Sequence, residues 1–278
     1  MNIALVISFL ALAAAVAACY YALKAKRWLW AELLALKQAH QSMQNDLVLA
    51  RKKILLAALR TELRLPAKLP SQHGEEILIH EFFGGKLDGF FVEIGAYDGV
   101  GFSNTYFLEA LGWDGLLIEA DPAQAKACRD ARPFSRVMNV ACGKRGGGTV
   151  RFKSVRGGLG LGTLGYMGDD PVHRARIERE GGHVEEIEVE LLSLDDIMAG
   201  KDRHIDVLSI DVEGAELDVL QGTSLDRLRP TLILLEDNSG GRNRTVFDLL
   251  NANGYRQAFV WYHNVFFVRN EDARNIKW

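Results

Sequence analysis

The chain has 278 residues, and its 33 lysines and arginines nearly balance its 36 aspartates and glutamates, which leaves a formal net charge of −3. This length can bury a full α/β core and leave residues over for an appendage. The charge gives no electrostatic support for a nucleic-acid partner, so we expect none. The three cysteines, at positions 19, 128 and 142, lack metal-ligand spacing, which argues against a disulfide framework or a structural zinc site.

An uncharged stretch at Ile3–Leu23 is long enough to cross a hydrocarbon core, which needs about 20 helical residues. Three basic residues follow it directly: Lys24, Lys26 and Arg27. Because basic flanks stay cytoplasmic, we predict a single-pass membrane anchor over residues 1–27, in contact with lipid through residues 3–23, and a cytoplasmic catalytic domain. The alternative is export, either by a cleaved signal peptide or by lipidation of Cys19 in a lipoprotein-like cleavage box.

Apolar residues recur at four-three spacing between Leu29 and Ala57, which is typical of a helix that can self-associate. The alternative is one amphipathic helix that packs on the domain or on lipid headgroups, with the basic residues 51–53 near anionic lipid. We therefore expect a juxtamembrane helical stalk and linker over residues 28–70, which can form a homo-oligomer, and a globular domain over residues 71–278.

The most informative segment runs from Phe90 to Pro122. An apolar run ends at Glu93, three glycines and a helical pattern follow, and a second apolar run ends at Glu119. This pattern predicts a βαβ unit whose first turn lets the backbone approach a ligand. Both acids would lie at the carboxyl ends of strands, where open α/β sheets bind ligands. The glycine spacing does not fit the dinucleotide fingerprint, which disfavours NAD.

A second strand, turn and helix pattern spans His204–Gly222. Its apolar run has the composition of a buried parallel strand and ends at Asp211, with Glu213 two residues later. We therefore expect these two acids at the same edge of the sheet as Glu93 and Glu119.

Four short segments, VEIGAYDG, IEADP, LSLDDI and IDVEGAELDVLQG, occur in the order found in FkbM-type methyltransferases, and the chain resembles this family over roughly residues 90–268. The IDVEGAE segment is the most specific of the four. The resemblance implies the α/β fold of class I methyltransferases, which is a Rossmann-like, seven-stranded, mostly parallel sheet with helices on both faces. It also implies S-adenosyl-L-methionine as the cofactor.

The same resemblance implies roles for individual residues. Asp211 and Glu213 would lie beside the sulfonium and the incoming acceptor. Many family members carry asparagine where Tyr97 and Asp98 stand, which leaves the detail of that loop open. The implied cofactor-binding residues are, from the methionine side through the ribose to the adenine, Glu93, Gly95, Ala96, Gly99, Glu119, Asp121, Asn139 and Ala141.

Methyl transfer to a hydroxyl needs a proton acceptor within hydrogen-bond reach. The candidates near strand ends are Asp211, Glu213, Glu236, Asp237 and His263. We predict Glu213 as the base and Asp211 as the residue that orients it or the cofactor. The alternative is that Glu213 is a helix N-terminal carboxylate stabilised by the helix dipole. Our prediction includes no metal, although Asp211, Asp237 and Asn238 resemble the magnesium site of catechol-type methyltransferases.

A glycine-rich segment, Gly157–His183, separates the two halves of the domain and predicts a mobile loop with a short helix over Pro171–Arg179. It could form a lid that shapes the acceptor pocket, or a surface insertion without such a role. His263 and Asn264, between the two closing strands, are further candidates for acceptor contact.

These features predict a membrane-anchored S-adenosylmethionine-dependent methyltransferase that modifies an oxygen of a glycan, a lipid-linked saccharide or a small metabolite. Three alternatives remain. The first is a tethered cofactor-binding protein without catalysis, the second is a magnesium-dependent catechol-type O-methyltransferase, and the third is a different nucleotide-binding α/β enzyme.

Overall fold

The computed structural model describes residues 70–157, 161–169, 171–237, 244–272 and 274, together with Glu32 and Leu36. The chain divides into two compact units, Met1–Glu62 and Leu63–Trp278. Within the first unit the two described residues are helical and exposed. The predicted membrane span and nearly all of the predicted stalk lie outside the described residues. Among those that are described, no helix combines the length and the apolar character needed to cross a membrane.

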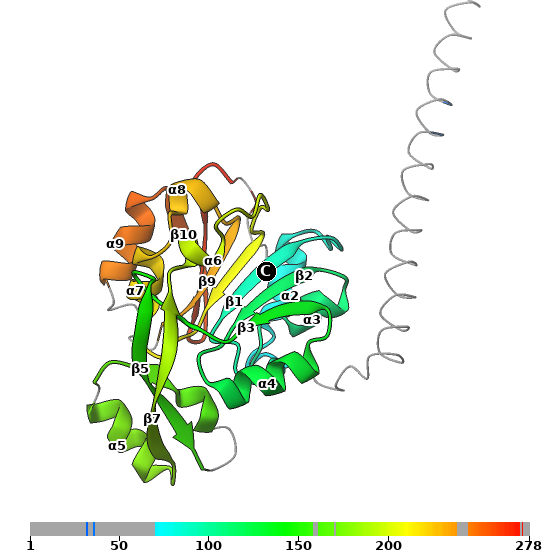
Figure 1. Ribbon diagram of the computed structural model, residues 1–278. Coiled ribbons are helices and arrows are strands. Elements are labelled where there is room, and N and C mark those ends of the chain that lie inside the picture. The colour runs from blue at the N-terminus through cyan, green and yellow to red at the C-terminus, as the bar shows by residue number, and fades with distance from the viewer. Residues whose placement is uncertain are drawn as a thin grey trace, which may run out of the picture. The chain divides into compact units, whose positions relative to one another are not determined.

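A seven-stranded sheet forms the centre of the second unit, in the order β10-β11-β9-β8-β1-β2-β3 (Figure 1). Five adjacent strands, β9, β8, β1, β2 and β3, run parallel to one another. The remaining strand pairs are antiparallel, because β11 runs antiparallel to both β9 and β10. This arrangement confirms the predicted seven-stranded, mostly parallel sheet. The strands are β1 (Phe90–Ile94), β2 (Asp114–Ile118), β3 (Ser135–Met138), β8 (Val207–Ile210), β9 (Leu232–Glu236), β10 (Tyr255–Trp261) and β11 (Asn264–Arg269).

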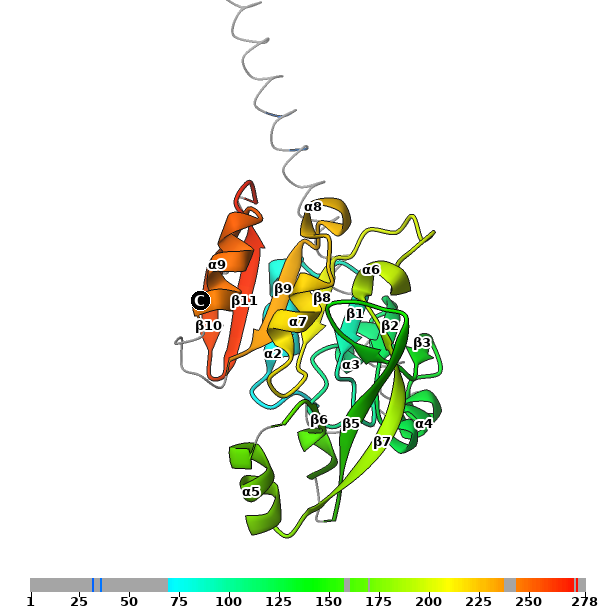
Figure 2. The same cartoon turned by 60° about the vertical axis from the view of Figure 1, so that its left-hand side comes forward.

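Helices cover both faces of this sheet, as predicted (Figure 2). Alternate residues of β1 point to opposite faces, so Phe90, Val92 and Ile94 join the core formed with α6 to α9. Phe91 points to the other face, where the Arg132 guanidinium lies 5.4 Å from its ring centroid. The helices on the face of Phe90, Val92 and Ile94 are α6 (Leu194–Ile197), α7 (Glu216–Gln221), α8 (Leu225–Leu228) and α9 (Arg244–Ala252). The helices on the other face are α2 (Glu75–Phe82), α3 (Tyr106–Ala110) and α4 (Pro122–Ala131).

A second, four-stranded sheet in the order β4-β7-β5-β6 was not predicted. Its long strands β5 and β7 carry an alternation of polar and apolar residues that is typical of half-exposed strands. Between its two long strands the sequence predicts a mobile loop and one helix. That helix, α5 (Pro171–Arg179), is confirmed. The strands are β4 (Ala141–Cys142), β5 (Gly148–Arg156), β6 (Tyr166–Met167) and β7 (His183–Leu192).

The glycine-rich segment before α5 has regular structure in its described part, which includes a 3-10 turn, η1 (Leu161–Leu164), followed by β6. Leu161, Leu164 and Tyr166 form a small core with Val155 of β5 and Ile177 of α5. This core holds η1 and β6 against the carboxyl edge of the large sheet, which is the edge that the βαβ pattern predicted for a ligand.

Candidate active site

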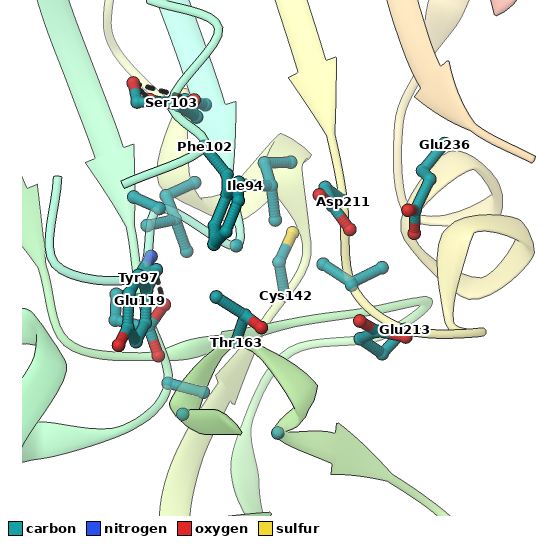
Figure 3. A pocket seen from close by; sticks show the side chains of 18 of the residues that line it. Ile94, Tyr97, Phe102, Ser103, Glu119, Cys142, Thr163, Asp211, Glu213 and Glu236 are labelled. Carbon is teal, nitrogen blue, oxygen red and sulfur yellow. Dashed lines mark hydrogen bonds between the residues drawn. The ribbon is translucent and has the colours of Figure 1, made fainter. Parts of the chain in front are cut away.

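A cavity opens at the carboxyl edge of the large sheet and is closed on the opposite side by η1 and β6 (Figure 3). About 940 Å³ of space, part of it open to solvent, lies between the atoms that line it. Its lining comes from the ends of β1, β2, β8 and β9, the start of β4, and the η1–β6 segment. The cavity therefore joins segments that are far apart in the sequence.

Close approach of β1 to β8 at this edge requires glycine at position 95. Gly95 has a φ of +86°, and a Cβ atom built there would lie 1.7 Å from the carbonyl oxygen of Asp211. The Gly95 and Ala96 N–H groups donate to the carbonyl of Ile118 at 2.9 Å and 3.2 Å. These contacts bring three parts of the predicted site together at the carboxyl edge of the sheet. They are the turn at Gly95 and Ala96, the end of β2 at Glu119, and the end of β8 at Asp211.

Glu119 faces the cavity from the end of β2. Its carboxylate accepts hydrogen bonds from the backbone N–H groups of Tyr97 at 2.8 Å and Asp121 at 2.7 Å. Burial raises the pKa of Glu119 to about 7, and these backbone hydrogen bonds oppose the rise. An ionised carboxylate has about four lone-pair sites, so about two remain for hydroxyl donors of a ligand.

Glu93 also borders the cavity, but protein donors surround its carboxylate. It accepts from the Asn104 N–H at 3.0 Å, the Ser103 hydroxyl at 2.9 Å and the Thr105 hydroxyl at 2.7 Å. The Arg132 guanidinium lies 3.7 Å away. Burial raises the pKa of Glu93, while Arg132 is the strongest opposing influence. Glu93 therefore anchors the segment that leads into α3.

Ser103 and Arg132 complete this anchor. The Ser103 hydroxyl accepts from the Tyr106 N–H at 3.1 Å, as expected of a residue at a helix start. Arg132 is 1% exposed and bonds Glu109 at 2.7 Å and the Gly99 carbonyl at 2.9 Å. The sequence analysis missed Arg132, because one arginine after a helix carries no sign that it is buried.

Three carboxyl groups meet on the other side of the cavity, at the ends of β8 and β9. Oxygens of Asp211, Glu213 and Glu236 all lie within 4.8 Å of one another (Figure 3). Burial raises the pKa of Asp211 well above its ordinary value, and the charges of Glu236 and Glu213 raise it further. Burial and Glu236 likewise raise the pKa of Glu213 to about 8. The raised pKa values of Asp211 and Glu213 favour their protonated forms near neutral pH, and a positive charge close by would favour their ionised forms.

The oxygen set that resembles a magnesium site stays untested, because only part of it is described. Asp211 lies with Glu213 and Glu236, whereas Asp237 lies outside the cavity lining. The backbone N–H of Asp237 donates to the carbonyl of His263. Asn238 falls outside the described residues, as does any contact that it makes.

Residues 93–257 match the family described as the methyltransferase FkbM domain. This match covers more than half of the chain and contains both motifs that line the cavity. The chain belongs to the FkbM methyltransferase family. This FkbM protein is accordingly an enzyme, and its methyl donor is S-adenosylmethionine. The predicted family and cofactor are both confirmed.

No curated protein matches the FkbM chain. Matching solved structures include a TehB-like SAM-dependent methyltransferase from Corynebacterium glutamicum, with 11% identity over 81% of this chain and 97% of that chain and a TM-score of 0.40. An O-methyltransferase from Bacillus cereus in complex with SAH shares 14% identity over 77% of this chain and 90% of that chain, with a TM-score of 0.37. Similarity at this level says nothing about the acceptor.

The residues that line the cavity of the FkbM domain fit the chemistry of S-adenosylmethionine. The Glu119 carboxylate is placed to accept from hydroxyl groups, and the apolar side chains of Ile118, Val140 and Phe152 offer surface for a flat ring. The acid cluster lies more than one strand away from Glu119 across the sheet. Its carboxyl groups offer negative charge for a sulfonium.

The predicted cofactor residues fall into two groups in this FkbM domain. The cavity lining includes Glu93, Gly95, Ala96, Glu119 and Ala141, and also Asp211 and Glu213. The other three, Gly99, Asp121 and Asn139, lie outside the lining, and their cofactor contacts stay a prediction.

Each of these three has a clear structural contact. Asp121 caps α4 through the Ala123 N–H at 2.8 Å and pairs with Arg156 at 2.6 Å. Asn139 donates to the carbonyls of Glu119 at 2.9 Å and Ala120 at 2.8 Å. Asp121 and Asn139 therefore support the backbone beside Glu119. Gly99 lies against Cys128 and Arg132.

Several lining residues had no sequence signal. Phe102 follows the three glycines of the Phe90–Pro122 segment, and Gly162, Thr163 and Met167 come from the segment that was predicted as a mobile loop. A glycine-rich segment gives no sign of which residue faces a ligand, so only the packing of η1 and β6 reveals them. These residues line the cavity, and a role as a lid for an acceptor stays a prediction.

Proposed function

We propose that this FkbM methyltransferase transfers a methyl group to an oxygen of a glycan, a lipid-linked saccharide or a small metabolite. The observation that carries the proposal is the acid cluster of Asp211, Glu213 and Glu236, which lies across the same cavity from Glu119. A carboxyl with a raised pKa beside an acceptor is suited to take up the proton of a hydroxyl group.

In this proposal Glu119 binds the ribose hydroxyls, while Gly95 and Ala96 border the methionine part of the cofactor. S-adenosylmethionine supplies a methyl group on a positively charged sulfur, which makes that carbon open to displacement. The protein mainly positions the acceptor in line with this carbon and balances charge. Asp211, once ionised, would favour the sulfonium, since opposite charges close together stabilise each other.

Glu213 is the proposed base. Its φ of +49° is unusual for a residue with a side chain, and such backbone strain concentrates at functional sites. A pKa of about 8 means that a cationic cofactor nearby converts the group from mostly protonated to mostly ionised near neutral pH. Glu213 can then accept the hydroxyl proton while the oxygen attacks the methyl carbon.

Replacing Glu213 by glutamine tests this function. We expect Glu213→Gln to lower turnover by about 10²- to 10⁴-fold, with cofactor affinity little changed. The measurement is transfer of labelled methyl groups into a cell extract, with cofactor binding followed by calorimetry. Asp218→Asn is the matched control, because it removes one carboxylate from the exposed side of α7. Full turnover of Glu213→Gln would remove this residue from the mechanism.

The proposal also includes the membrane. Residues 3–23 would anchor the enzyme in a bilayer, and the basic residues after them would keep the catalytic domain on the cytoplasmic side. A reporter that is active only in the cytoplasm, fused to the C-terminus, should be active. Deletion of residues 1–27 should release the enzyme from the membrane fraction. An inactive reporter would contradict the proposed cytoplasmic position of the catalytic domain.

Magnesium-dependent transfer is the second candidate, because the oxygens of the acid cluster lie close enough together to bind one ion. Exhaustive chelation separates the two. Unchanged activity after chelation supports metal-free transfer, whereas loss of activity that magnesium restores supports the second candidate.

A further inference from the structure

Residues 70–76, which we call the strap, lie where the predicted linker meets the globular domain, and they form part of the cavity wall. Gln72 of the strap is one of the residues that line the cavity. The strap lies outside residues 93–257, which match the FkbM family. Part of the cavity is therefore built by a segment that the family match does not include.

The strap is fixed to the adjoining ends of β10 and β11. The indole N–H of Trp261 donates to the carbonyl of His73 at 2.9 Å. The side-chain amide of Asn264 donates to the carboxylate of Glu75 at 2.8 Å. Asn264 is also the residue of β11 that pairs with Glu236 of β9. These bonds therefore hold the strap beside the strand that carries one member of the acid cluster.

Glu75 is the residue that joins these contacts. Its side chain is buried, and its second oxygen accepts from the backbone N–H of His73 at 2.9 Å. One carboxylate therefore bonds the strap and the start of β11 at the same time. Removing it would leave the Asn264 amide and the His73 N–H without this acceptor, and buried donors that lose their partner are costly. We expect the strap to detach when Glu75 is truncated.

The other end of the strap holds Phe102. The backbone N–H of Phe102 donates to the carbonyl of Pro70 at 3.0 Å. The φ of Phe102 is +63°, in the left-handed region, and a residue with a side chain keeps such a conformation only where its surroundings hold it. Its ring lines the cavity between Glu119 and Asp211 (Figure 3). The Pro70 contact therefore bears directly on where this ring lies.

We propose that the strap positions the Phe102 ring against the bound cofactor, and that Glu75 is the positioning residue that keeps the strap in place. The inference rests on the proposed function, which places the cofactor between Glu119 and the acid cluster. An aromatic ring offers apolar surface, and its face attracts a cation such as a sulfonium. Glu75 itself lies outside the cavity lining, so it acts only through the strap.

A double-mutant cycle on cofactor affinity tests the strap. Calorimetry measures the binding of S-adenosylhomocysteine to the full chain and to three variants. We expect Glu75→Ala to bind about tenfold more weakly, which corresponds to a strap that is docked in about one molecule in ten. Phe102→Ala, which lacks the ring, should also lose about tenfold. The double variant should lose about tenfold and not about a hundredfold, because both changes remove the same contact.

Glu81→Ala is the matched control, because it removes a carboxylate from the exposed side of the same helix, α2. Its affinity should equal that of the parent. Glu75→Gln should also bind normally, because Asn264 can turn its side-chain amide to match the new one.

Trp261→Phe is a milder variant, which loses only the hydrogen bond of the indole N–H to His73. We expect it to bind about threefold more weakly, as suits the loss of one neutral hydrogen bond. If Glu75→Ala does not fold, Trp261→Phe takes its place in the cycle, and the double variant should then match Phe102→Ala alone.

A lower thermal midpoint of Glu75→Ala with unchanged affinity would show a purely structural role and would overturn the inference. So would normal affinity of Phe102→Ala, or losses that multiply in the double variant. Failure of the cofactor placement is a separate result, because Glu119→Ala would then bind S-adenosylhomocysteine like the parent. Failure of the proposed base would appear only in turnover, as full activity of Glu213→Gln.

Discussion

Buried Glu93 and a half-buried acid cluster border one cavity in this enzyme, and their neighbours give these two groups opposite properties. Glu93 lies with Arg132 and three hydrogen-bond donors from the start of α3. The acid cluster of Asp211, Glu213 and Glu236 has its own carboxyl groups as its nearest charges. The first group is satisfied by the protein. In the second group, Glu236 raises the pKa of both Asp211 and Glu213, so a positively charged ligand would stabilise the ionised forms of these two acids.

The causes of the pKa shifts express the same contrast. Burial raises the pKa of Glu93, but Arg132 and the hydroxyls of Thr105 and Ser103 all act against burial. For Asp211, burial, the Glu236 charge and the Glu213 charge all act in the same direction. Residue type and position at a strand end are alike in both groups. The difference comes from which helix packs beside the strand.

Removal of Arg132 should break the first group and produce the largest effect. Arg132→Met leaves Glu93 and Glu109 buried without a cation, and we expect a loss of about 3–5 kcal/mol in the free energy of unfolding. Denaturant unfolding measures this change. Arg129→Met, on the exposed side of α4, is the control and should change stability little. A loss no larger than that of the control would show that Glu93 does not depend on Arg132.

Truncation of Glu119 sharpens the contrast within the cofactor half of the cavity. Unlike Glu93, Glu119 has lone pairs left for a ligand, so Glu119→Ala should weaken S-adenosylhomocysteine binding by about 10- to 100-fold, as expected for a charged hydrogen-bond partner. Calorimetry measures the affinity. Glu186→Ala, on the exposed β7 strand, should bind normally. Equal affinity of Glu119→Ala and the parent would remove the proposed ribose contact.

The smallest expected effect concerns the stability of the acid cluster. The pKa of Glu213 rises from 4.5 to about 8 on folding, so between these values the folded protein holds a proton that the unfolded chain has released. Stability contributed by this group therefore falls as the pH rises through this window. We expect Glu213→Gln to be more stable than the parent by about 1–2 kcal/mol near pH ~9 and equal to it near pH ~4, allowing for partial solvent screening.

Thermal or denaturant unfolding of both proteins across this pH range, without cofactor, measures the difference. Asp218→Asn provides the reference for loss of one exposed charge. A difference between Glu213→Gln and the parent that does not grow with pH would mean that Glu213 carries no raised pKa.

Much of the fold could be predicted because it depends on short-range patterns. The apolar runs ending at Glu93, Glu119 and Asp211 have the length and composition of buried parallel strands, and all three are strands of the large sheet. The second sheet was missed, although the alternation in β7 is a strand signal. Its residues pair with residues of β5 that lie 27 or more positions earlier (Arg156 with His183), and pairing over that distance is not visible in a local pattern.

Sequence alone determined which elements form, that their acidic ends share one edge, and that the chain resembles the FkbM family. These conclusions follow from periodicity and from motifs, which are local. Only the tertiary structure decided that Arg132 forms an ion pair with Glu93, that Glu236 lies beside Asp211 and Glu213, and that Phe102 lines the cavity. A carboxyl group takes its role from the charges and donors within a few ångströms, and packing brings those neighbours from distant parts of the chain.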